Sequence, residues 1–168
     1  MNYQKGVGLT EVIVAMFLLG GAVLGYAFLQ FKSLEMSEQA LKKVEAMNIA
    51  RNLGERMFVN KDIKYQDITI SSANQNNCIF VDTTLTTCSS ENLAAKDLAD
   101  INRITSNKGM SFDIHPCPGT QNGRQCIYVA WDETRPIPED DDEADNACTE
   151  SDVFRYKANA HCVVVEAF

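Results

Sequence analysis

An uncharged apolar run of twenty residues, Val12–Phe31, constrains this 168-residue chain more than any other feature. As a helix rising about 1.5 Å per residue, the run spans about 30 Å, the thickness of the hydrocarbon layer of a bilayer. A cleaved secretion signal has a shorter apolar region of about 7–15 residues, followed by small residues at the cleavage site. The run is therefore predicted to remain in the mature chain as a membrane-spanning helix.

The predicted helix continues beyond the apolar run. Apolar residues recur there at spacings mostly near three, four or seven positions, with charged and polar residues between them: Leu34, Leu41, Val44, Met47, Leu53 and Met57. This period is typical of an amphipathic helix. No proline interrupts residues 7–58. The sequence predicts one helix of about 50 residues, whose second half needs a partner for its apolar stripe in the rest of the chain.

Glu11 stands at the start of the apolar run and invites two interpretations. A charged residue at the centre of a membrane helix costs about 2.5 to 3.5 kcal/mol, and somewhat less near the end of the span. The carboxylate either reaches water at the headgroups or has a cationic partner. A cut between Gly6 and Val7 would create that cation, an α-amino group one helical turn from Glu11. Opposite charges 4 Å apart attract by about 4 kcal/mol at an effective dielectric constant of 20.

The six cysteines all follow the apolar run: Cys78, Cys88, Cys117, Cys126, Cys148 and Cys162. An even number behind an export-type segment indicates disulfides formed in an oxidising compartment. Zinc is the competing interpretation, but the cysteines lack close-spaced pairs, and His115 and His161 are far apart. Among the fifteen possible connectivities, sequential pairing is preferred: 78–88, 117–126 and 148–162.

Residues 32–168, which include the amphipathic half of the long helix, are predicted to form a small α+β domain in which this helix packs on a C-terminal antiparallel sheet. A helix is expected at about 91–105, capped by Ser90. Alternating apolar residues predict several strands. The strand candidates are Asp67–Ile70, "CIFVD" (78–82, a strand or a turn), "MSFDIH" (110–115), "QCIYVAWD" (125–132), "VFRYK" (153–157) and "HCVVVEAF" (161–168).

The charge distribution excludes some functions. The formal net charge is −8 and no basic cluster is present, which argues against nucleic-acid binding. The stretch "PIPEDDDEADN" (136–146) lacks the glycine and the ligand spacing of an EF-hand, so it is interpreted as a solvated acidic loop. Binding of Ca²⁺ by residues 139–145 is left open. His115 and His161 lie near no nucleophile motif, so no enzymatic activity, cofactor or metal is expected.

The N-terminal residues resemble the class III leader of type IV prepilins, in which a short basic leader ends in glycine and a glutamate stands fifth in the mature chain. Here these pieces are Lys5, Gly6, Val7 and Glu11. The wording of residues 6–25, together with "IYVAWDE" (127–133), is similar to the PilV-like minor pilins. The resemblance is strongest over residues 5–31 and extends to about residue 58.

The resemblance implies that the chain has three parts with different roles. Residues 1–6 would be a leader, removed by a membrane prepilin peptidase that cuts at Gly6/Val7 and N-methylates Val7. Residues 7–31 would hold the subunit in the inner membrane and later lie in the core of a pilus. Residues 32–168 would form the globular domain, periplasmic before assembly and extracellular in the fibre. Glu11 would pair with the N-terminus of a neighbouring subunit during assembly.

The function implied is that of a minor pilin, a structural and assembly-priming subunit at or near the tip of a type IV pilus. It would support pilus biogenesis and hence twitching motility and adhesion. Expected partners are other minor pilins and the major pilin through their N-terminal helices, the prepilin peptidase, and a tip adhesin. Two alternatives remain open: a type II secretion pseudopilin, which would share the leader and fold, and a membrane-tethered adhesin or binding module that never assembles.

Overall fold

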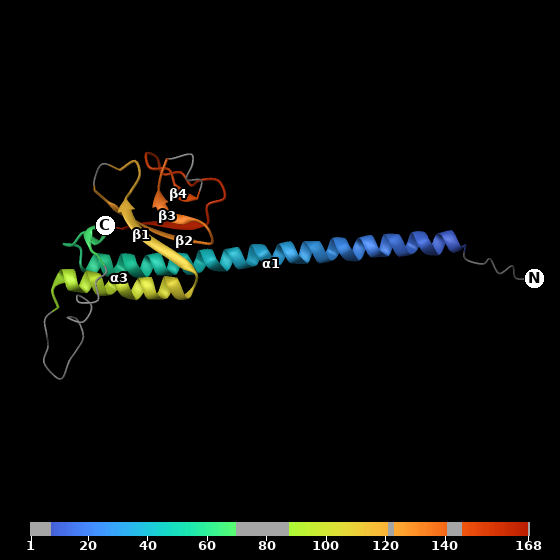
Figure 1. Ribbon diagram of the computed structural model, residues 1–168, viewed down its shortest axis with the longest axis horizontal. Helices are drawn as coiled ribbons and strands as arrows, with labels where there is room; N and C mark the ends of the chain where they lie inside the picture. The colour runs from blue at the N-terminus through green and yellow to red at the C-terminus, as the bar shows by residue number, and fades with distance from the viewer. Residues whose placement is uncertain (1–7, 70–87, 121–122, 141–145, 168) are drawn as a thin grey trace, which may run out of the picture. The chain divides into compact units, whose positions relative to one another are not determined.

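Helix α1 extends from Leu9 to Val59 and confirms the predicted helix of about 50 residues. The computed structural model describes residues 8–69, 88–120, 123–140 and 146–167. The chain consists of two compact units, Met1–Leu41 and Lys42–Phe168. Helix α1 contributes to both, and Figure 1 follows it from blue to green along the chain. The first unit contains the apolar part of α1, and the second contains every other element.

The centre of the second unit is an antiparallel sheet of three strands in the order β1-β2-β5. Strand β1 comprises Met110–Pro116, β2 comprises Gln125–Trp131 and β5 comprises Cys162–Ala167. These are the predicted strands 110–115, 125–132 and 161–168. Val129 in the middle of β2 pairs with Phe112 of β1 and Val163 of β5.

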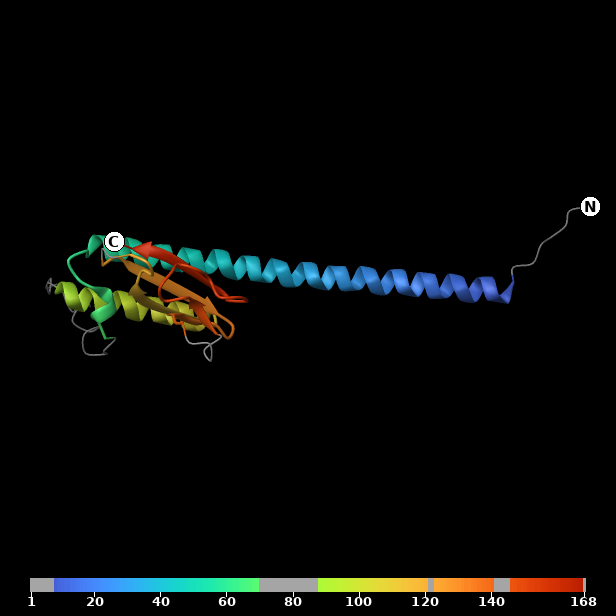
Figure 2. The same ribbon diagram turned by 90° about the horizontal axis from the view of Figure 1, so that it is seen from above.

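One face of the sheet packs against the last part of α1 and against helix α3, Ser90–Asn107. Figures 1 and 2 show α3 beside this part of α1, with the strands lying over the pair. Leu53 of α1, Ile101 of α3 and Ile127 of β2 are each at most 1% exposed. Each such aliphatic side chain stabilises the folded domain by about 1.5–3 kcal/mol. Of the apolar stripe predicted on the second half of α1, Leu53 and Met57 are buried here and Met47 packs against the core. The earlier residues of the stripe, Leu34, Leu41 and Val44, are exposed.

The opposite face of the sheet is covered by a smaller cluster that contains two disulfides. Cys117 is bonded to Cys126, and Cys148 to Cys162, as predicted. They pack with Tyr128 of β2. Strand β2 is buried along its whole length for this reason, because its odd-numbered side chains face α1 and its even-numbered side chains face the disulfides.

A two-stranded parallel sheet, formed by β3 (Arg135–Pro138) and β4 (Ala147–Thr149), was not predicted. Strand β3 includes residues 136–138, the first residues of the stretch that was predicted to be an acidic loop, and β4 follows that stretch. Cys88 is also disulfide-bonded, while its predicted partner Cys78 lies outside the described residues, as does the strand candidate 78–82.

Three local predictions were wrong. The N-cap of α3 is Ser89 rather than Ser90, because the Ser89 hydroxyl accepts the N–H of Asn92 at 3.2 Å. The strand expected at Asp67–Ile70 is not formed by its described residues, 67–69. Asp67 instead ends the single 3₁₀ turn η1, Tyr65–Asp67, which places the Tyr65 ring in the core. Residue 70 itself is outside the described part.

The predicted strand "VFRYK" (153–157) is also absent. Its backbone makes only an isolated bridge between Tyr156 and Thr149. The side chain of Arg155 turns back to Glu150 and forms ion-paired hydrogen bonds of 2.6 and 2.7 Å, which close a tight loop. The alternation of apolar and polar residues at 153–157 therefore belongs to a loop and not to a strand of a sheet.

Candidate functional site

The first unit presents an apolar helix surface without a packing partner within the described chain. Large apolar side chains are exposed all round it, including Phe17 (78%) and Leu18 (71%). None of the most apolar eighteen-residue window is buried, and by length and composition the helix can cross a membrane. Soluble monomers rarely expose so much contiguous apolar surface unless it meets a membrane or another protein. This surface is the first part of the candidate site.

Glu11 lies in the first turn of α1, where its N–H donates to the carbonyl of Gly8 at 3.0 Å. A carboxylate in this turn interacts favourably with the positive end of the helix dipole. Glu11 forms no ion pair with any residue in the described ranges. Lys5, Gly6 and Val7 lie outside them, so the proposed cut and its new amino group remain predictions.

The charged part of α1 begins at Lys32, whose ammonium group is 2.7 Å from the carboxylate of Glu35. Both side chains are more than half exposed. An exposed pair of this kind contributes well under 1 kcal/mol to stability. The Lys32–Glu35 pair marks the position on α1 where the wholly apolar surface ends and an amphipathic surface begins.

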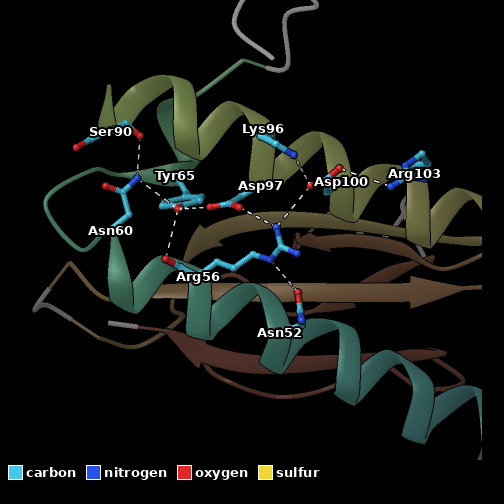
Figure 3. Close-up of polar contacts among 9 residues, drawn as sticks. All are labelled: Asn52, Arg56, Asn60, Tyr65, Ser90, Lys96, Asp97, Asp100 and Arg103. Atoms are coloured by element: carbon cyan, nitrogen blue, oxygen red, sulfur yellow. Dashed lines mark hydrogen bonds and ion pairs between the residues drawn. The ribbon is translucent and has the colours of Figure 1, made fainter. Parts of the chain in front are cut away.

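In the second unit, a partly buried polar network centred on Arg56 holds this portion of α1 (Figure 3). The guanidinium group of Arg56 donates to Asp97 of α3 at 2.7 Å and lies 3.7 Å from Asp100. It also donates to Asn52, one turn earlier on α1, at 3.0 Å. Asp97 is only 6% exposed. A buried carboxylate needs such a cation and hydrogen bonds, because burial without them is strongly unfavourable.

Tyr65 and Asn60 connect the same network to the segment after α1 (Figure 3). The hydroxyl of Tyr65 donates to Asp97 at 3.0 Å, and the amide of Asn60 donates to the carbonyl of Ser90 at 2.8 Å. Burial, together with the nearby carboxylate of Asp97, raises the pKa of Tyr65 to about 12. The network therefore ties α1, η1 and α3 together at one place.

Sequence reasoning missed this network, although one signal was present. Asp97 lies three residues after Ala94 and four before Ile101, so it stands on the apolar face of α3. A carboxylate at such a position indicates a buried cationic partner. The partner, Arg56, is 41 positions away in the sequence, and nothing in the local pattern singles it out.

The two histidines lie at separate places and have ordinary structural contacts. His161 is 2.8 Å from the carboxylate of Asp132 and stacks on Trp131, while His115 is 3.2 Å from Asp113. Asp132 also accepts from Lys42 of α1 at 3.0 Å. Neither histidine is joined to a serine or cysteine nucleophile by these contacts. The contacts of Asp132 connect the end of β2 to α1 and to the residue before β5, whereas His115 and Asp113 both lie in β1.

The acidic stretch is described only in part. Asp140 accepts hydrogen bonds from the backbone N–H of Ser151, at 2.7 Å, and from its hydroxyl. These bonds lower the pKa of Asp140. Residues 141–145 lie outside the described ranges, and within those ranges no group of three or more metal-binding side chains is present.

Residues 28–99 match the family model of the Tt1218-like type IV pilins. The matched segment starts within the apolar part of α1 and ends in α3, so it contains both halves of the Arg56–Asp97 pair. It supports a type IV pilin, and the long helix packed on an antiparallel sheet with disulfides is a pilin-like α+β fold. The leader residues precede the match, and the PilV-like subtype and the cut stay predictions. No curated protein and no solved structure matches the chain.

Proposed function

We propose that this chain is a minor pilin, a structural and assembly-priming subunit of a type IV pilus that acts at or near the tip. The observation that supports this most is the 51-residue helix α1, whose apolar first part is exposed while its last part is packed into a domain. The pilin family match over residues 28–99 is independent support.

The proposed mechanism starts with removal of residues 1–6 and methylation of Val7. Residues 7–31 then anchor the subunit in the inner membrane, with residues 32–168 outside it. During assembly this helix leaves lipid and packs beside the helices of other pilins. Lipid is as apolar as the helices, so the hydrophobic effect gives little preference between these two surroundings.

A polar interaction is therefore needed to fix which helices meet and in what register. The carboxylate of Glu11 supplies it by pairing with the N-terminal amine of a neighbouring subunit. In a low-dielectric surrounding such a pair is far stronger than in water. An unpaired carboxylate there is costly, so subunits that are out of register are disfavoured.

The test is incorporation of the Glu11→Ala variant into pili sheared from cells. We expect membrane insertion to be unchanged and the amount in the pilus fraction to fall about tenfold or more, because loss of a pair worth even 1.4 kcal/mol is a tenfold change. Glu35→Ala is the matched control, since it removes a carboxylate from the same helix beyond the apolar run. Its incorporation should equal that of the wild type.

Three results would contradict the proposal, each in a different way. Normal incorporation of Glu11→Ala would remove the role assigned to Glu11. Absence of the wild-type chain from pili, with the protein still in the membrane, would favour a membrane-tethered binding module. Recovery with components of a type II secretion system instead of minor pilins would identify a pseudopilin.

A further inference from the structure

An apolar groove runs between α1 and the outer edge of β5 in the globular domain. We call it the α1–β5 groove. It has a volume of about 430 Å³, and its apolar lining comes from Gly54, Phe58 and Val59 of α1 and Val165 of β5. Val59 is 81% exposed, so the groove opens to solvent.

The hydrogen bonds of the sheet show which backbone groups of β5 face this groove. The N–H of Trp131 donates to the carbonyl of His161 at 3.0 Å, next to the pair Ala130–Cys162. In an antiparallel ladder the bonded and non-bonded positions alternate. Val163 and Val165 therefore bond to β2, and the backbone groups of Cys162, Val164 and Glu166 point away from the sheet.

Side chains accept hydrogen bonds from some of the outward backbone N–H groups of the edge strands. The outward N–H of Val164 donates to the hydroxyl of Tyr156 at 3.2 Å. On the opposite edge of the sheet, the outward N–H of Ile114 donates to the carboxylate of Asp113 at 2.8 Å. Such protection is expected, because unpaired strand edges recruit other strands. In the described part of the chain, no acceptor is recorded for the outward N–H of Glu166, which lies at the groove.

We propose that the α1–β5 groove binds an extended segment of a partner protein, which adds to the sheet as a short strand beside Glu166. The free backbone groups of Glu166 would supply hydrogen bonds, and alternate apolar side chains of the segment would enter the groove, as in other cases of strand addition. From Arg51 to Val59 the helix rises about 12 Å, which is the length of about four strand residues.

The charges around the groove define the partner further. Arg51 lies one helical turn before Glu55, and Glu166, which is already paired with Arg124, lines the β5 side. A segment with an acidic residue near Arg51 and a basic residue near Glu55 complements this arrangement. A second copy of the chain is a poorer partner, because two copies of net charge −8 repel each other. This contact involves only the globular domain and does not depend on the proposed helix packing.

The probe is a short fluorescent peptide that alternates valine and threonine between a terminal glutamate and a terminal lysine. It is titrated into the full-length chain in detergent and followed by anisotropy. We expect saturable binding, and we expect the same peptide with its alternate amides N-methylated to bind at least fivefold more weakly. One net hydrogen bond accounts for about a fivefold change. A peptide with glutamate at both ends should also bind more weakly.

The decisive comparison is Glu166→Pro against Glu166→Ala. Both remove the carboxylate and its ion pair with Arg124, but only proline removes the outward N–H. Proline is tolerated where the N–H of an edge strand faces away from the sheet, so both variants should fold. The proline variant should bind the peptide about five- to tenfold more weakly than the alanine variant.

A second pair of variants leaves β5 unaltered. Val59→Lys places a charge in the groove, and Val44→Lys makes the same change at an exposed site of α1 outside it. Only the first should weaken binding. The proposal is overturned if wild type does not bind the peptide, or if the proline and alanine variants bind it equally. A dimer of the full chain that Glu166→Pro abolishes would replace the partner with a second copy and would also overturn it.

Discussion

Tyr65 illustrates how single residues hold this domain together. Its ring is 1% exposed, and its hydroxyl donates to Asp97, which in turn accepts from Arg56. The phenol thus acts as a neutral donor to a buried carboxylate. Burial disfavours the charged phenolate, and the neighbouring carboxylate of Asp97 would repel it, so the pKa of Tyr65 is raised to about 12.

This pKa predicts how stability depends on alkaline pH. Below pH 10 the phenol is neutral in both the folded and unfolded chain. Between pH 10 and about 12 only the unfolded phenol ionises, so the free energy of unfolding falls as pH rises, by about 2 kcal/mol from this group. Tyr65→Phe loses the hydrogen bond, about 1 kcal/mol at neutral pH, but has no such decline.

Urea unfolding of both proteins in detergent at several pH values measures the effect. Wild type should be about 1 kcal/mol more stable than Tyr65→Phe at neutral pH and about 1 kcal/mol less stable near pH 12, so the difference should reverse sign above pH 10. A difference that stays constant over this range would show that the phenol does not carry the alkaline loss. Because the comparison is between two otherwise identical chains, the titration of other groups cancels.

At the level of elements, the structure depends on the joint between α1 and α3. Asp97→Asn removes the charge that Arg56 meets at 2.7 Å and should lower the free energy of unfolding by about 2 kcal/mol. Asp100→Asn is the matched control on the same helix. Its side chain is 28% exposed, its distance to Arg56 is 3.7 Å, and its 3.0 Å bond with Lys96 is a partly exposed pair one turn apart on α3. Its loss should therefore cost well under 1 kcal/mol.

Chemical unfolding in detergent, followed by near-UV circular dichroism, gives both values. Equal losses for the two variants would mean that surface charge, and not the buried pair, connects the helices. A loss for Asp97→Asn below that of Asp100→Asn would contradict the network drawn from the contacts of Tyr65 and Arg56.

The elements that the sequence predicted well are those with long periodic patterns. Helix α1 was predictable because apolar residues recur at helical spacing without a proline, and β1, β2 and β5 because they alternate. The β3–β4 sheet was missed because β3 contains two prolines, Pro136 and Pro138, and each strand is short. Residues 153–157 were misjudged because the ion pair of Arg155 with Glu150, which closes the loop, has no periodic signal.

At the level of the whole molecule, the two units of the chain differ in the surfaces they present. The first unit offers an exposed apolar helix with one carboxylate near its start, and the second a domain with a packed core and two described disulfides. Much of the candidate site was predictable, since Glu11 and the apolar run stand out in the sequence. The α1–β5 groove was not, because Gly54 and Val165 come together only through the fold.

The central claim is that this chain is processed and assembled as a pilin, and the intact mass of the native protein tests it most directly. After purification from its own membrane or pili, the mass should correspond to residues 7–168 with one added methyl group on Val7. This result would place the new amino group one turn from Glu11. A mass that still includes residues 1–6 would contradict the account.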